Sequence, residues 1–297
     1  MNFELAQLTD GDLAAALAEQ AGQHLLNLRT ERFAQNPNPD SVVLKALGDE
    51  ADRTANDLIV GSLKSLRPND AILSEESTDD LARLDADRVW IVDPLDGTRE
   101  YKIAGNSEWA VHIALWEREH NVNPNPNGTT SATPATSATS AISQDGPVGY
   151  LKVGVVGLPT FGMVLRSDQP GDPFSAPSAP SGRLRIVRSA SREQPVADGV
   201  AQRLNGELIS MGSAGAKAMA VVRGEAEVYI HTGGQWEWDS AAPIVVAQGH
   251  GLFVARIDGS TIRYNQRDPY LPDLVVCRAD LSDQVMAAVH AVTASLP

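Results

Sequence analysis

The chain has 297 residues, of which 42% are hydrophobic, and a formal net charge of −14 at pH 7. This length can bury a substantial core, either as one large domain or as two tightly joined halves. Because the acidic chain has no Lys/Arg-rich run to neutralise a phosphate backbone, a nucleic-acid polymer is excluded as its ligand. A small phosphate ester still suits this charge if divalent cations form part of the site.

The sequence also carries signals about the compartment. It has no run of 18 uninterrupted apolar residues, and its N-terminus, MNFELAQLTDGD, is acidic, so neither a transmembrane helix nor a signal peptide is expected. The single cysteine, Cys277, lies in the apolar run LVVC and is expected to be a buried core residue rather than a nucleophile. Since one chain with one cysteine cannot form an internal disulfide, the composition fits the reducing cytoplasm.

Two helices are predicted before the first strand. Residues 9–32 place leucines and alanines at helical spacing behind a Thr-Asp pair that could cap the helix. Residues 48–66, GDEADRTANDLIVGSLKSL, predict a second amphipathic helix whose first turn carries Asp49 and Asp52. Acidic residues are favoured in a first turn by the helix dipole, so each is by default a surface residue.

The stretch VWIVDPLDGTRE, residues 89–100, is the most informative segment of the chain. Its apolar run, 89–92, predicts a buried strand that breaks into a turn at Asp93. Pro94 supports this boundary, because it cannot donate to a sheet ladder and it disfavours helical angles at the preceding residue.

The turn after this strand combines two kinds of binding group. Asp93 and Asp96 are two carboxylates three residues apart on a rigid turn, which suits a hard cation. Gly97 follows in a turn dipeptide, and Thr98 is a candidate helix N-cap or first-turn residue with spare backbone N–H groups that suit an anion. The segment could therefore hold a phosphate between a metal ion and a helix end.

Two further acidic clusters have a matching design. In AILSEE, residues 71–76, an apolar strand ends directly before Glu75 and Glu76. In GQWEWDSAAP, Asp239 is placed where a helix would begin, as its N-cap, with Pro243 in the first turn. Three element ends that bear carboxylates are more than turns alone require.

The middle of the chain predicts strands separated by links. Residues 109–117 and 148–167 have the β-branched, apolar pattern of neighbouring strands in an antiparallel sheet. Between them, the Asn-, Pro-, Ser- and Thr-rich insertion 121–147 predicts a long, mobile hairpin tip. A second Pro/Ser-rich link, 168–182, divides the chain into an N-terminal half, 1–182, and a C-terminal half, 183–297.

The second half alternates strands with helices, which argues for a layered α/β unit. A Gly/Ser turn is expected to lead into one of its helices, and the apolar run 241–246 to begin another. The predicted order is strand 183–191, helix 194–205, helix 214–223 and a strand after it, the helix from 241, strands near 252–258 and 273–278, and helix 281–294.

The three acidic motifs, SEE, DPLDGT and WDSAA, in this order and at these separations, resemble the inositol monophosphatase superfamily of magnesium-dependent, lithium-sensitive phosphatases. Within it, SEES, VDPLDGTRE and SMGSAGAKA look most like the CysQ-type 3'(2'),5'-bisphosphate nucleotidase branch in its actinobacterial form. The resemblance runs from about Asp10 to Cys277. It implies an α+β or α/β fold, a layered αβαβα sandwich with an antiparallel sheet in the N-terminal half and an α/β C-terminal half.

The resemblance also implies a site for two to three Mg²⁺ ions. Glu75, Asp93 and the carbonyl of Leu95 would hold the first ion. Asp93, Asp96 and Asp239 would hold the second, and Glu75 would help to hold a weaker third. The alternative from a different class is a non-catalytic phosphate- or metal-binding regulator that kept the fold. Loss of one of these positions would indicate such a regulator, and none of them is missing.

Catalytic roles follow from the same resemblance. Asp52 and Thr98 would orient and deprotonate the attacking water beside the ion held by Glu75. Asp49 competes with Asp52 for this role, because the local sequence GDEAD departs from the family's usual T-x-x-D pattern.

Substrate contacts are implied at the phosphate and around the sugar. Gly-Ser-Ala-Gly is also an ordinary helix start, and the lysine that follows it could equally be a solvated surface charge. The candidate substrate-binding residues are Gly97, Thr98, Ser189, Ser213, Lys217 and Asp239.

The function expected from the resemblance is hydrolysis of the 3'-phosphate of adenosine 3',5'-bisphosphate to AMP, in sulfate assimilation. Inositol monophosphate or fructose 1,6-bisphosphate as substrate is the main alternative. The partner is therefore a small phosphorylated molecule, with no membrane and no nucleic-acid polymer. Relatives often form dimers through apolar faces, so a homodimer is a further expectation.

Overall fold

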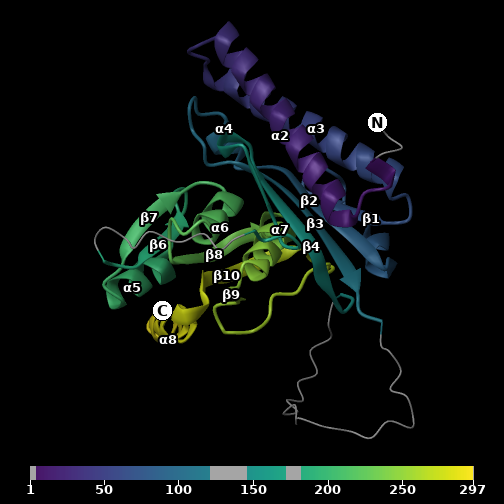
Figure 1. The fold of residues 1–297 in the computed structure, drawn as a ribbon. Helices are drawn as coiled ribbons and strands as arrows, with labels where there is room; N and C mark the ends of the chain where they lie inside the picture. The colour runs from purple at the N-terminus through teal and green to yellow at the C-terminus, as the bar shows by residue number, and fades with distance from the viewer. Residues whose placement is uncertain (1–4, 121–145, 172–181, 297) are drawn as a thin grey trace, which may run out of the picture.

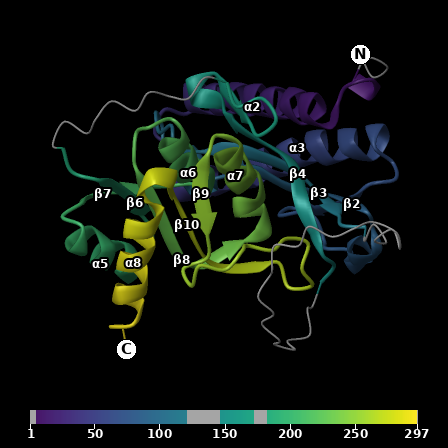
Figure 2. The same cartoon turned by 60° about the horizontal axis from the view of Figure 1, so that its bottom comes forward.

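The computed structural model describes residues 5–120, 146–171 and 182–296 as five alternating layers of helices and sheets (Figure 1). Helices α2 (Asp10–Gln35) and α3 (Ser41–Leu66) cover the outer face of the first sheet, and α6 (Ala214–Val222) and α7 (Glu237–Gly249) lie between the two sheets. The far face of the second sheet is covered by α5 (Pro195–Arg203) and α8 (Ser282–Thr293), as Figure 2 shows. The predicted αβαβα sandwich is confirmed.

The first sheet is antiparallel apart from one edge. β1 runs parallel to β2, and the other neighbours are antiparallel, so the predicted antiparallel sheet holds for four of the five strands. The single strand expected over 148–167 is two strands joined by a short 3-10 helix at Pro159–Phe161. In sheet order, the strands are β1 (Ala71–Ser74), β2 (Arg88–Asp96), β3 (Ala110–Arg118), β4 (Gly149–Leu158) and β5 (Met163–Arg166).

The second sheet is mixed. β6 pairs in parallel with β7 and β8, whereas β10 is antiparallel to β8 and β9. The edge strand β7 was not predicted, because its sequence, ELISM, leaves most of its side chains partly or fully exposed and gives no clear alternation. In sheet order, the strands are β7 (Glu207–Met211), β6 (Arg185–Ser189), β8 (Val228–Trp236), β10 (Tyr270–Arg278) and β9 (Leu252–Ala255).

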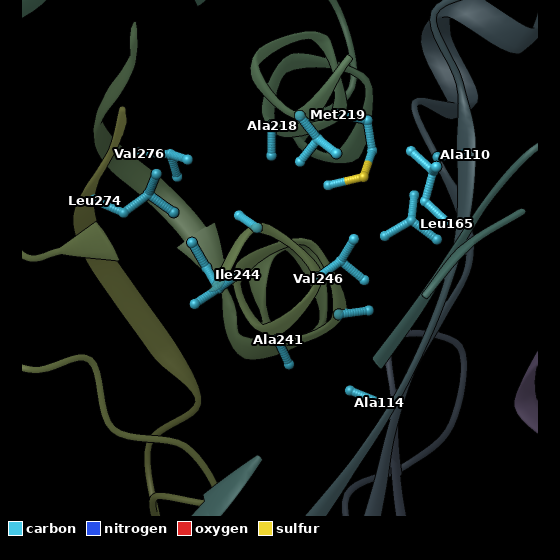
Figure 3. Packing of buried hydrophobic residues seen from close by; sticks show 14 of the residues in the cluster. Ala110, Ala114, Leu165, Ala218, Met219, Ala241, Ile244, Val246, Leu274 and Val276 are labelled. Carbon is cyan, nitrogen blue, oxygen red and sulfur yellow. The ribbon is translucent and has the colours of Figure 1, made fainter. Parts of the chain in front are cut away.

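Helix α7 forms the centre of the main core because both sheets pack on it. Figure 3 shows Ile244 pointing toward Leu274 and Val276 of β10, while Val246 points toward the strands of the first sheet. Gly154 on β4 permits this close approach, since a Cβ there would lie 2.2 Å from a methyl group of Val245. A second core, under α2 and α3, holds the first sheet from the other side.

Several predicted boundaries are wrong for local reasons. Helix α3 begins at Ser41 rather than at residue 48, because the carboxylate of Asp40 caps it by accepting from Val42 N and Val43 N at 2.9 Å. Val42 is 75% exposed, so this first part has no apolar face to reveal it. As a result, Asp49 and Asp52 lie in the middle of the helix, where the dipole argument for acidic residues does not apply.

The two segments that carry the central carboxylates also differ in detail. β2 continues through Pro94 to Asp96, with an irregular register after Asp93, instead of ending at residue 92. Helix α7 begins at Glu237 with Trp236 as N-cap, so Asp239 is the third helical residue and Pro243 lies in the helix interior.

Other predictions were confirmed or fall outside the described residues. Thr9 caps α2 by accepting from Asp12 N at 3.1 Å, and Cys277 is fully buried. Among the described residues, no helix is both long and apolar enough to cross a membrane. Most of the predicted insertion 121–147 and of the link 168–182 lies outside the described residues.

Candidate active site

Three carboxylates meet where β2 ends and α7 begins. One oxygen from each of Asp93, Asp96 and Asp239 lies within 4.8 Å of the other two. Asp93 is fully buried; its Oδ1 accepts from Leu95 N at 3.0 Å, whereas its Oδ2 is buried without a hydrogen-bond partner. A buried carboxylate oxygen without a partner is costly. This donor set, made only of oxygen atoms, therefore fits a hard divalent cation.

Asp96 is oriented by the N-terminus of α6. Its carboxylate accepts from Ser213 Oγ at 2.5 Å, from Ala214 N at 3.1 Å and from Gly215 N at 2.6 Å. Ser213 is also the N-cap, since its Oγ accepts from Ala216 N at 3.0 Å. Spare N–H groups and the helix dipole both favour an anion at this position. The predicted substrate residue Ser213 thus lies against a carboxylate of the acidic cluster.

His112 on β3 was not predicted and lies inside the cluster. It is fully buried, with Nε2 3.3 Å from Asp96 Oδ2 and Nδ1 3.1 Å from the carbonyl oxygen of Trp238. Burial lowers its pKa, which favours the neutral ring. A single histidine in the apolar strand WAVHIALWE looks like a core residue. Its place in the site is set by segments distant in the sequence, among them Gly215, where a Cβ would lie 2.0 Å from His112 Nε2.

Burial, and then the crowding of like charges, raise the pKa values of this group. Burial, and then Glu75 and Asp96, raise the pKa of Asp93 well above its usual value. Burial and the charge of Asp96 raise the pKa of Asp239 to about 7. Desolvation by the surrounding protein, and then the charge of Asp239, raise the pKa of Glu75 to about 8, although its side chain still reaches solvent. A bound cation would relieve this repulsion.

Glu75 and Glu76 occupy the turn after β1, as expected. Glu75 N donates to the carbonyl of Val92 at 3.2 Å, which fixes the turn against the neighbouring strand β2. Burial, and then the charge of Asp49, raise the pKa of Glu76. Glu75 is therefore the member of the pair whose pKa responds to the carboxylates of the cluster.

Thr98 connects this centre to Asp52. The Thr98 hydroxyl lies 3.1 Å from Asp52 Oδ1 and 3.2 Å from the carbonyl oxygen of Leu95, and it can donate to one of them at a time. Burial and the charge of Glu76 raise the pKa of Asp52 to about 7. Asp49 instead pairs with Lys45 on the exposed surface, at 2.5 Å. The fold brings Asp52, and not Asp49, to the threonine.

Gly97 allows the chain to turn into the short helix α4 (Thr98–Tyr101). Its φ of +90° lies in the left-handed region, and a Cβ would lie 2.9 Å from the carbonyl oxygen of Glu108. Both facts favour glycine at this position. Thr98 is consequently the first helical residue, while Gly97 takes the N-cap position.

A cavity of about 170 Å³ adjoins the acidic cluster. Asp96 and Asp239 line it together with basic and hydroxyl side chains from helices α4 and α6, from β6 and from the loop after β6. The predicted residues Gly97, Ser189, Ser213 and Lys217 all line it as well. Arg99, Glu100, Ser191, Arg192 and His231 also line it and were not predicted.

Lys217 is a buried cation in the wall of this cavity, with 4% of its surface exposed. Its ammonium donates to the carbonyls of Gly212 and Ser213, at 3.2 and 2.5 Å, and lies 5.5 Å from the ring centre of Tyr229. Both acceptors are neutral, so neither cancels the positive charge. Burial lowers its pKa, while the charge of Asp96 opposes this shift.

Arg192 contributes a second cation from the exposed side. Its Nη1 donates to the carbonyls of Gly233 and Gly234, at 3.0 and 2.6 Å. A Cβ at Gly234 would lie 1.6 Å from that nitrogen. The Gly-Gly pair therefore holds the guanidinium at the cavity. From the sequence, Arg192 is one of many exposed arginines, and no local signal distinguishes it.

Comparison with known proteins agrees with this geometry. The model of the inositol monophosphatase family matches residues 9–124 and 155–294, which is most of the chain. The chain belongs to the inositol monophosphatase family. It is accordingly a phosphatase, a hydrolase of phosphoric monoesters, and the family predicted from the three acidic motifs is confirmed.

Two relatives within this family extend over nearly the whole chain. A 3'-phosphoadenosine 5'-phosphate phosphatase of Mycobacterium leprae is 45% identical over 288 residues, which covers 97% of this chain and 96% of the relative. The 3'(2'),5'-bisphosphate nucleotidase CysQ of Escherichia coli K12 is 27% identical and covers 88% of this chain and 96% of the relative. The crystal structure of CysQ from Bacteroides thetaiotaomicron has the same fold, with a TM-score of 0.65, 24% identity, and coverage of 90% of this chain and 96% of that one.

Proposed function

We propose that this phosphatase removes the 3'-phosphate of adenosine 3',5'-bisphosphate, giving AMP and inorganic phosphate, with Mg²⁺ as cofactor. The observation that carries the proposal is a cavity with acidic and basic walls. Asp96 and Asp239 lie in the acidic wall beside the unpartnered oxygen of Asp93, and Lys217 and Arg192 supply positive charge. The names of the mycobacterial and CysQ relatives support the same substrate.

The acidic wall is the proposed place of two to three Mg²⁺ ions. Glu75, Asp93 and the carbonyl of Leu95 would hold the first, Asp93, Asp96 and Asp239 the second, and Glu75 would contribute to a third. When bound, magnesium stabilises the negative charge on the transferring phosphoryl oxygens. Three donors of this set approach one another within 4.8 Å, which supports a shared ion.

Asp52 and Thr98 prepare the attacking water. The pKa of Asp52, raised to about 7, suits a general base at neutral pH, because it accepts a proton readily and is still substantially ionised. The Thr98 hydroxyl, 3.1 Å from that carboxylate, fixes its direction. The backbone N–H groups of Gly97 and Thr98 would hold the phosphate oxygens.

The basic part of the cavity would hold the second phosphate and the sugar. Lys217 has a charge that its carbonyl partners do not cancel, and Arg192 is held at the opening by main-chain carbonyls. Ser189 has its hydroxyl 3.2 Å from that of Ser191 in the same wall and would donate to the sugar or phosphate. Ser213 and Asp239 would border the sugar from the acidic side. A bisphosphate matches two cationic groups better than a monophosphate does.

In the cell, this reaction would remove a by-product of sulfate assimilation in the cytoplasm. Lithium would inhibit it by taking one magnesium place. The alternative substrates, inositol monophosphate and fructose 1,6-bisphosphate, use the same acidic wall but make different demands on Lys217 and Arg192.

The direct test is phosphate release from adenosine 3',5'-bisphosphate, inositol 1-phosphate and fructose 1,6-bisphosphate, measured side by side with Mg²⁺ and with or without Li⁺. We expect kcat/KM for the nucleotide to exceed the others by about a hundredfold, or roughly 2.7 kcal/mol of transition-state discrimination. Comparable values would indicate a broad sugar-phosphate phosphatase. No phosphate release from any of the three would contradict the proposed activity and favour a non-catalytic regulator.

A further inference from the structure

A buried polar network links the loop that carries Glu75 to the helix that carries Asp239. Its centre is Arg83, in the 3-10 helix η1 (Leu81–Asp85) between β1 and β2, with 1% of its surface exposed. Toward one side, Arg83 Nε and Nη2 donate to the two carboxylate oxygens of Asp79, at 2.7 and 3.0 Å. Asp79 lies four residues after Glu75 in the same loop.

Toward the other side, Arg83 reaches the loop between β9 and β10. Its Nη1 donates to Asn265 Oδ1 at 2.6 Å, and its Nη2 donates to the carbonyl of Gln266 at 2.8 Å. Asn265 is fully buried and has a φ of +59°, so the main chain is held in an uncommon conformation there. The guanidinium therefore joins two loops that are about 180 residues apart in the sequence.

This second loop holds the beginning of α7. The main-chain N–H groups of Asn265 and Gln266 donate to the two carboxylate oxygens of Glu237, at 2.6 and 2.8 Å. Glu237 is 2% exposed and is the first residue of α7, while Asp239 is the third. The order of contacts is thus Asp79, Arg83, loop 265–266, Glu237.

The Glu75 loop is also fixed from its other side. Ser74 Oγ donates to Asn56 Oδ1 of α3 at 2.7 Å, and Asn56 Nδ2 donates to Ser77 Oγ at 3.4 Å. Contacts with α3 therefore hold one side of the loop, and the Arg83 network joins the other side to the start of α7. The hydrogen bond from Glu75 N to the carbonyl of Val92 ties the start of the loop to β2, and the Arg83 network ties its later part to α7.

We infer that Arg83 is a positioning residue, which sets the distance between Glu75 and Asp239 and so fixes the affinity of the site for its divalent cations. The inference rests on the proposed function. A lysine cannot replace the guanidinium, because only the planar fork makes a bidentate contact with Asp79 while also donating to two further acceptors. Groups that support metal ligands in this way commonly change metal affinity by about 10- to 100-fold when they are substituted.

The test is Mn²⁺ binding to the substrate-free protein, followed by electron paramagnetic resonance, with Arg83→Lys and Arg83→Met. We expect both variants to weaken binding by roughly tenfold or more. A simple effect of charge predicts the opposite for Arg83→Met, since loss of a nearby positive charge should tighten cation binding. If Arg83→Met does not fold, Arg83→Lys, which keeps the charge and loses the fork, carries the test.

The matched control is Arg256→Lys. Arg256 makes a similar bidentate pair with the buried Asp273, with both distances 2.7 Å, but this pair joins the end of β9 to β10. We expect Arg256→Lys to lower Tm without changing Mn²⁺ affinity. Wild-type affinity in Arg83→Lys, with only a lower Tm, would show a merely structural role and overturn the inference. Absence of Mn²⁺ binding in the wild type would overturn the proposed metal site itself.

Discussion

At the scale of single residues, the fold gives chemically identical side chains different surroundings. Asp49 and Asp52 are one helical turn apart on α3, yet Asp49 pairs with Lys45 on the surface and Asp52 meets Thr98 beside the acidic cluster. Burial and the charge of Glu76 then raise the pKa of Asp52 to about 7. The assignment of the base therefore rests on contact and environment, which the local sequence GDEAD could not separate.

Asp52→Asn tests this assignment. We expect kcat to fall by about 10²- to 10⁴-fold with little change in KM, because the amide cannot take a proton from water. In the wild type, kcat/KM should rise with pH through about 7 as Asp52 loses its proton, and this dependence should disappear in the variant. Asp49→Asn is the control and should retain wild-type rates. A pH profile that Asp52→Asn leaves unchanged would assign the base elsewhere.

At the scale of elements, the site depends on close packing of the N-terminus of α6 against β3. Gly215 donates to Asp96 and lies so close to His112 that an added Cβ would be 2.0 Å from Nε2. Because the ring is buried and bonded to the carbonyl of Trp238, it has little room to move. The helix end and the carboxylate that it orients are thus one packed unit.

Gly215→Ala should push the N-terminus of α6 away from His112. We expect it to lower the free energy of unfolding by about 2 kcal/mol through overpacking and to reduce activity as Asp96 moves. The matched control is Gly61→Ala in α3, where an added Cβ meets nothing within 4 Å. This change should stabilise the protein by about 1 kcal/mol through helix propensity, with activity unchanged. Denaturant titration measures the free energy of unfolding of both variants. Equal changes in Gly215→Ala and Gly61→Ala would contradict the packing argument.

The same scale explains what the sequence could predict. The close approach of Asp93 and Asp96 could be predicted because it follows from a local pattern, two carboxylates three residues apart at the end of an apolar run. His112 and Arg83 were missed because their surroundings come from segments far away in the chain, α7 for one and loop 265–266 for the other. The start of α3 was missed because Val42 and Val43 are exposed, and a helix without an apolar face has no periodic signal there.

At the scale of the whole molecule, the acidic cluster links stability to pH and metal. The pKa values of Asp93, Glu75 and Asp239 are raised above those of the unfolded chain, so the metal-free native state binds more protons than the unfolded state. This contribution to stability is fully present below about pH 4 and is lost as pH rises through about 7 to 8. Divalent cations should reverse the loss by binding the deprotonated carboxylates.

Thermal unfolding with EDTA or with Mg²⁺ measures this linkage. We expect the rise in Tm caused by Mg²⁺ to be clearly larger near pH 8 than near pH 5, because protons compete with the metal at the lower pH. Sodium chloride of equal ionic strength serves as the control for screening. A Mg²⁺ effect that is the same at both pH values would argue against binding at these carboxylates.

The most direct measurement of the central claim is made on Asp93→Asn, with phosphate release from adenosine 3',5'-bisphosphate and calorimetric Mg²⁺ binding followed on the same protein. Asp93 belongs to both proposed ion sites, and its Oδ2 is the buried oxygen without a partner. We predict that turnover falls by roughly a thousandfold or more and that Mg²⁺ affinity falls with it, while the fold is retained. Wild-type turnover in a folded Asp93→Asn protein would contradict a metal-dependent reaction at this cluster.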